Sequence, residues 1–135
     1  MPKEIVDTKL SGDLIANPDV IWSGEALANA GTITSGAFKL GQTLGGVEVK
    51  VVTNTGGTLA GNVTVELKLS ATEDGSYVTE SSDLVNLGTV LADGDDIARF
   101  ILPREIEDLL YAKLAITTAG ADQAILVDAY PVFVS

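Results

Sequence analysis

The chain of 135 residues contains 19 acidic and 8 basic residues, a formal net charge of −11, and 46% of its residues are hydrophobic. This length predicts one domain with a sizeable core, and the apolar content argues against intrinsic disorder. The sequence has no Cys and no His, which excludes disulfides, thiol nucleophiles and the acid–base or metal chemistry of those side chains.

The acidic balance also bears on the partners of the protein. Nucleic-acid binders present a basic stripe to phosphates, and this sequence shows none, so we expect no nucleic-acid partner. No apolar run approaches the roughly 20 residues of a transmembrane helix. The first residues, MPKEIVD, lack the basic and apolar regions of a secretory signal. We therefore expect synthesis in a cytoplasm, no membrane partner and no cofactor.

Residues 1–24 form an irregular N-terminal arm in this interpretation, and residues 25–135 form a single β-sandwich domain. The arm mixes single apolar residues with Pro, Asp, Asn and Gly, and no period dominates. It either packs on its own domain or lies on a neighbouring subunit or partner, and Trp22, the only Trp, is the natural anchor in both cases. The candidate partner-binding residues are Ile5, Leu10, Ile15, Ile21 and Trp22.

Strand patterns follow the arm in close succession. Residues 25–30 predict a brief strand or turn, and residues 31–40 a strand interrupted at Ser35-Gly36. The valines of residues 47–53 predict a strand that ends at a glycine turn. Residues 62–71 show the cleanest alternation of apolar and polar side chains, which indicates one core face and one face toward water or a partner.

The middle of the chain predicts shorter elements. We expect turns at residues 73–75 and 81–83, a short strand at 77–79 between them, and strands at 85–91 and 97–102. Pro103 then opens two helical turns, with acids early where the helix dipole favours them. This short helical corner near residues 103–110 carries the chain into the next strand.

The last part of the chain predicts two long strands, residues 110–118 and 124–134. A short connector with a glycine separates them, so we interpret the pair as an antiparallel hairpin. The fold class is therefore all-β: an antiparallel, jelly-roll-like β-sandwich of roughly seven to nine short strands.

Two acidic groups in the sequence offer carboxylates for chemistry. Asp93, Asp95 and Asp96 surround Gly94 in a loop that offers oxygen ligands to calcium, but an Asp-Gly turn between strands explains them better. Glu105, Glu107 and Asp108 offer paired carboxylates for glycoside hydrolysis, but the helix dipole explains acids at that position. We expect no catalytic residue and no metal ligand, and hence no enzyme.

Two further features leave alternatives open. Carbohydrate-binding modules share the sandwich fold, yet the aromatic residues that line sugar clefts are few and spread along this chain. Arg99 and Arg104, the only arginines, are candidates for ion pairs across a subunit interface or within the domain.

Three pieces of the sequence resemble the cement, or decoration, proteins of tailed bacteriophages. They are the strand and turn of residues 64–77, the Leu102-Pro103 corner that leads into residues 110–116, and the closing strand at 124–129. The likeness covers roughly residues 46–134, and the longer N-terminal region departs from it. The resemblance implies a jelly-roll homotrimer on the capsid surface of the virion, bound where major capsid proteins meet, with no catalytic residues.

The sequence therefore predicts a viral structural protein that binds the outside of a tailed-phage head and stabilises contacts between major capsid proteins. The alternatives are a carbohydrate-binding β-sandwich module or phage surface adhesin domain, and a hydrolase that uses carboxylates alone.

Overall fold

The computed structural model describes residues 3–5, 20–40, 46–102 and 111–134, which form strands, turns and loops, with no helix in those ranges. The predicted all-β, antiparallel sandwich is confirmed. The strands are β1 (Lys3–Ile5), β2 (Trp22–Ala26), β3 (Thr32–Thr34), β4 (Phe38–Leu40), β5 (Gly46–Thr55), β6 (Gly57–Thr58), β7 (Val63–Ser70), β8 (Val78–Val85), β9 (Val90–Leu91), β10 (Asp96–Leu102), β11 (Tyr111–Thr118) and β12 (Leu126–Val134).

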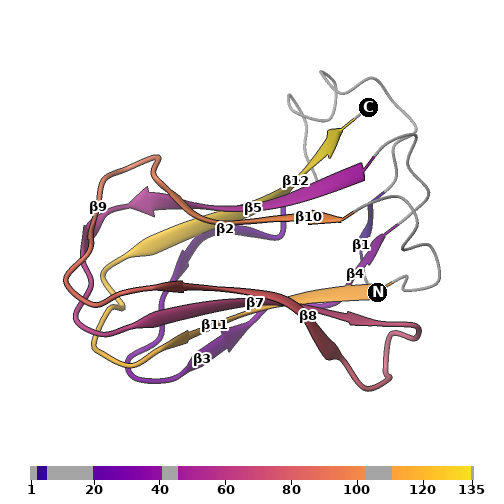
Figure 1. Cartoon of the computed structure of the whole chain (residues 1–135), viewed down its shortest axis with the longest axis horizontal. Coiled ribbons are helices and arrows are strands. Elements are labelled where there is room, and N and C mark those ends of the chain that lie inside the picture. Colours follow the sequence, from indigo (N-terminus) through magenta and orange to yellow (C-terminus); the bar gives the residue numbers. More distant parts are fainter. Residues whose placement is uncertain (1–2, 6–19, 41–45, 103–110, 135) are drawn as a thin grey trace.

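Two sheets make the two layers of the sandwich (Figure 1). The first, called sheet A, has the order β1-β4-β11-β7-β8, with β3 also paired to β11. The second, sheet B, has the order β10-β5-β12-β2, and a two-stranded ribbon of β6 and β9 lies at one end. All the paired strands are antiparallel except β1 and β4.

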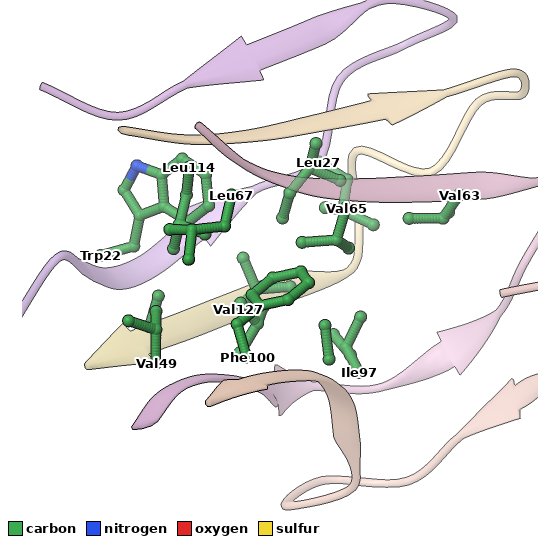
Figure 2. Packing of buried hydrophobic residues seen from close by; sticks show 14 of the residues in the cluster. Trp22, Leu27, Val49, Val63, Val65, Leu67, Ile97, Phe100, Leu114 and Val127 are labelled. Carbon is green, nitrogen blue, oxygen red and sulfur yellow. The ribbon is translucent and has the colours of Figure 1, made fainter. Parts of the chain in front are cut away.

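The core lies between the two sheets because alternate residues of the long strands are apolar. In β7 every second residue from Val63 to Leu69 is at most 3% exposed, as the alternation predicts. Sheet B contributes Val49, Val51 and Val127, each 0% exposed, and Phe100, and the two sets of side chains project toward one another (Figure 2). Each such side chain stabilises the fold by about 1.5–3 kcal/mol relative to an exposed position.

The predicted hairpin between the last two strands is wrong. β11 is paired in sheet A with β7, whereas β12 is paired in sheet B between β5 and β2. Their connector therefore crosses from one layer to the other. Both strands bury one apolar face, with Leu114 and Val127 at 0% exposure, and crossing lets these faces pack against each other through the core. A hairpin would place both faces on the same side of one sheet.

The prediction around residues 81–91 is also wrong in detail. Residues 81–83, expected as a turn, lie inside β8, and a turn occupies residues 86–89, where a strand was expected. β8 is the edge strand of sheet A, and most of its residues are exposed, so a Ser-Ser-Asp run costs it no buried polar groups. Asn86 and Gly88 supply the turn, and Gly88 has a φ of 83°.

Several smaller features complete the comparison with the sequence. The expected break at Ser35-Gly36 separates β3 from β4. Short strands such as these and the β6–β9 ribbon raise the strand count within the described residues to twelve, above the expected number. The helical corner at 103–110 lies outside the described residues. In the described ranges, no helix has the length and apolar character needed to cross a membrane.

The expected boundary between the N-terminal arm and the sandwich domain does not coincide with the end of a structural element. β2 pairs with β12, with Trp22 opposite Ala129, so the boundary expected between residues 24 and 25 falls inside a strand of sheet B. From Val20 onward the chain belongs to the sandwich, because Ile21 donates its backbone N–H to the Ala129 carbonyl at 2.8 Å.

Candidate functional site

Three large apolar side chains are exposed within a short stretch of the sequence that runs from the end of β8 through a turn into β9, the strand at one end of the sandwich (Figure 1). Leu84 is 58% exposed, Leu87 64% and Val90 70%, and we call these three residues the apolar tip. A contiguous apolar patch on a soluble protein marks an interaction site, whereas single exposed apolar residues are ordinary. Val78, at the other end of β8, is 68% exposed and provides an isolated comparison.

Backbone hydrogen bonds hold the apolar tip in place. The N–H of Leu87 donates to Asn62 Oδ1 at 2.8 Å, and the N–H of Gly88 donates to the Leu59 carbonyl at 2.9 Å. In return, the N–H of Leu59 donates to the Thr89 carbonyl at 3.0 Å. The turn is therefore fixed to the segment that precedes β7, which lowers the entropy lost when a partner binds its side chains.

Packing below the tip also fixes its orientation. Val90 and Leu91 form β9, in which Val90 points outward and Leu91 is 6% exposed within the core cluster. A Cβ atom at Gly56 would overlap the carbonyl of Leu91, so the two backbones approach as closely as they do only because this residue is Gly. A Cβ at Gly57 would lie 3.1 Å from Ile125.

The acidic loop lies beside this end of the molecule, and its carboxylates have partners within the fold. Asp93 Oδ1 accepts the N–H of Gly56 at 2.8 Å, and Asp95 Oδ2 accepts the N–H of Ala92 at 2.8 Å. Asp96 lies 3.9 Å from Lys50 Nζ. In the part of the chain that the structure describes, no group of three or more acidic side chains is arranged to hold a metal ion.

One strong ion pair lies on the outward face of sheet B. Arg99 donates from Nε to Glu48 Oε1 at 2.9 Å and from Nη2 to Oε2 at 3.0 Å. This pair is within the domain, one of the two arrangements considered for Arg99. The hydrogen bonds from Arg99 are the largest cause that lowers the pKa of Glu48, and burial opposes them. Arg104 lies outside the described residues.

The predicted partner-binding residues lie in different parts of the structure, and some lie outside the described residues. Trp22 is 8% exposed in the core cluster and Ile21 packs against that cluster, so both side chains contribute to the core of their own domain, and their role as partner contacts stays a prediction. Ile5 ends β1, and nothing further is described of its side chain. Leu10 and Ile15 lie outside the described residues.

The apolar tip was missed in the sequence because residues 85–91 fit a strand pattern. In a strand, half of those apolar side chains would face the core. The signal that argues against the strand is the Asn-Leu-Gly sequence at residues 86–88, a typical turn composition that leaves its central Leu without a core to enter.

Comparisons with known proteins add little to this description. No family model and no curated protein matches the sequence. A solved structure, hydroquinone 1,2-dioxygenase from Sphingomonas sp. TTNP3 with 4-hydroxybenzoate bound, aligns with 15% identity over 100% of this chain and 83% of that chain. Its TM-score of 0.21 is too low to carry an argument about fold or chemistry.

Proposed function

We propose that this protein is a capsid cement protein, which binds the outside of a tailed-phage head and joins neighbouring major capsid proteins. The observation that carries the proposal is the apolar tip, in which Leu87 is held on a hydrogen-bonded turn between two further exposed residues, Leu84 of β8 and Val90 of β9. The resemblance of roughly residues 46–134 to phage decoration proteins suggests the partner, a major capsid protein. An interface typically draws most of its binding energy from a few such anchors.

The mechanism requires no reaction. A protein that binds the assembled shell better than its dispersed subunits stabilises the shell by mass action. Burial of three large apolar side chains provides up to about 1.5–3 kcal/mol each, from which the cost of association must be subtracted. One tip alone therefore gives modest affinity.

A homotrimer would raise that affinity, and we include it in the proposal. When three linked tips reach three neighbouring capsid subunits, the second and third contacts form within a complex that already exists. The overall affinity is therefore higher than that of one tip. Sedimentation equilibrium at micromolar concentration is expected to give three times the monomer mass. A monomer under these conditions would remove the trimer from the proposal and leave the tip to be tested separately.

The test of the tip uses purified empty heads of the phage whose genome encodes the protein. Cosedimentation is measured for the full chain, for L84S/L87S/V90T and for V78T, which changes an equally exposed Val at the other end of β8. The triple variant is expected to lose at least about tenfold in affinity, which corresponds to about 1.4 kcal/mol. V78T is expected to bind as the unchanged chain does.

The outcomes separate clearly. Equal binding by the triple variant and the unchanged chain would show that the tip is not the docking site. Failure of every variant, the unchanged chain included, to bind heads would reject the cement function. A saturable interaction with glycans by the unchanged chain, combined with that failure, would favour the carbohydrate-binding alternative.

A further inference from the structure

Strand β10 forms one edge of sheet B and carries backbone groups that can accept a further strand. The order of that sheet is β10-β5-β12-β2, so within the described ranges β10 is paired on one side only, with β5. The register of the pair runs without a break from Ala98 to Leu102. Successive residues of an antiparallel strand direct their N–H and C=O groups to opposite sides. The other side of β10 is therefore a row of groups on which another strand can pair.

The residues of this edge do not block such pairing. Edge strands of native proteins are commonly blocked by charges, Pro or bulges. Residues 97–102 contain no Pro and one charged residue, Arg99, whose guanidinium is bound by Glu48. The register shift of β10 lies at its start, before Ala98. Ile101 is 67% exposed on the outward face. A regular, apolar edge strand of this kind is a predicted site of association.

The edge of sheet A on the same side of the sandwich is blocked. That edge is β8, which contacts β10. Asp83 of β8 lies opposite Val65, which is 0% exposed in the core, so its carboxylate is on the core side of the strand. The register between β7 and β8 also shifts between Leu67 and Lys68. Inward-pointing charges and bulges prevent edge-to-edge pairing. The contrast with β8 leaves β10 as the edge available on this side.

The second edge of sheet B, β2, is shorter and less regular than β10. It spans five residues and contains Gly24 at a φ of 64°. Its register with β12 shifts between Val127 and Ala129, and the N–H of Gly24 donates to Asp128 Oδ1 at 2.7 Å. Of the two edges of sheet B, β10 therefore offers the longer regular run.

A second copy of the chain fits this edge when the two β10 strands run antiparallel about a two-fold axis, because each copy then presents the same groups to the other. An axis at Arg99 would set two guanidinium groups opposite each other, which is unfavourable. An axis at Phe100 sets Ile101 of each copy opposite Arg99 of the other. Because Glu48 holds the guanidinium of Arg99, the methylene stem of that arginine can cover the exposed Ile101.

We propose that β10 pairs with β10 of a second copy, antiparallel and centred on Phe100, so that two sheets B join into one continuous sheet. The edge itself adds little charge, since Glu48 offsets Arg99 in each copy. Asp83 of β8 and Asp96 at the start of β10 oppose the approach of the two acidic chains, and salt screens that repulsion. The proposal concerns a surface other than the apolar tip and does not depend on the cement function.

The size of the interface sets the concentration at which pairing is expected. One pair of edge strands buries a small area, which is typical of weak and transient association. We therefore expect the pair to form at submillimolar concentration, above the micromolar range in which the homotrimer is tested. The average mass should rise with concentration, and it should rise further at about 1 M salt than at physiological salt.

The test combines sedimentation equilibrium of the full chain with two matched variants. I101K places a lysine on the edge opposite Arg99 of the second copy and is expected to weaken self-association at least about tenfold. V78K makes the same change at a Val that is 68% exposed at the far end of β8, and it is expected to associate as the unchanged chain does. Thermal melting at micromolar concentration should be the same for all three proteins, because both positions are exposed.

A second measurement on the unchanged chain locates the contact. In a mixture of two differently isotope-labelled preparations, NMR is expected to show intermolecular contacts between Ile101 of one copy and Arg99 of the other. The proposal is overturned if the mass stays constant up to submillimolar concentration at both salt levels, or if I101K associates as well as the unchanged chain. It is also overturned if the intermolecular contacts lie on the apolar tip and L84S/L87S/V90T abolishes them.

Discussion

Arg99 holds the carboxylate of Glu48 through two parallel hydrogen bonds, at 2.9 and 3.0 Å, between the neighbouring strands β10 and β5. Glu48 is 8% exposed although it lies on the outward face of sheet B. Ile101 and Val132 occupy the positions opposite it on the two flanking strands. An acidic residue so covered depends on its arginine, because a buried carboxylate without a partner is costly.

The first prediction concerns pH. The folded-state pKa of Glu48 is below its unfolded value, so the pair contributes stability above the unfolded pKa and loses it as the pH falls through the folded pKa. Urea unfolding between pH 7 and pH 3 should therefore show a steeper loss of stability for the unchanged chain than for E48Q. The exposed Glu80 supplies the control: E80Q should follow the unchanged chain. Parallel curves for E48Q and the unchanged chain would contradict this.

The second prediction compares two leucines in opposite environments. L67A removes a side chain that is 0% exposed in the core and should lower the free energy of unfolding by about 2–5 kcal/mol. L87A makes the same chemical change at a residue that is 64% exposed and should alter it by less than about 0.5 kcal/mol. Urea denaturation measures both. Similar losses in the two variants would mean that the tip is buried in the protein as it exists in solution.

The third prediction concerns the contact of two loops. A Cβ at Gly61 would overlap the backbone of Ala119 and Gly120, which forms part of the connector between the sheets. G61A should therefore lower stability by about 1–3 kcal/mol, as overpacking does. G36A is the matched control, since a Cβ there meets nothing within 4 Å. Thermal melting of the two variants decides the matter, and equal melting temperatures would contradict the described contact.

The fourth prediction concerns Asp122, which is 2% exposed in the same connector. Its Oδ1 accepts the N–H of Ala60 at 2.7 Å, which ties the connector to the segment before β7. D122A leaves that N–H without its acceptor and should cost about 1–3 kcal/mol. D122N keeps an oxygen at the same place and should cost less. If chemical denaturation gives D122N a lower free energy of unfolding than D122A, the hydrogen bond is not the stabilising contact.

The sequence predicts the local elements better than their pairing. Alternation in β7 identifies its core face because side chains of a strand point alternately to its two sides. The same rule gives β11 and β12 as strands but does not say whether two neighbouring strands share a sheet or face each other across the core. That choice depends on contacts such as Ala60 with Asp122, which are 62 residues apart and leave no local pattern.

The candidate site was harder to predict from sequence, for two physical reasons. Trp22 attracts attention as a large anchor, but it lies in strand β2, where a large apolar side chain gains more from its own core than from a surface position. Leu84, Leu87 and Val90 have ordinary apolar composition, and only the fold shows that they are exposed.

The position of β12 has a consequence for biosynthesis. This strand lies between β5 and β2 in sheet B, so until it is present β2 lacks its sheet partner and β5 is paired only with β10. Because ribosomes deliver the chain from its N-terminus, sheet B cannot close while residues 126–134 are still being made or remain in the exit tunnel. The nascent polypeptide must hold β2 and one edge of β5 unpaired until then, and unpaired strand edges expose a chain to aggregation.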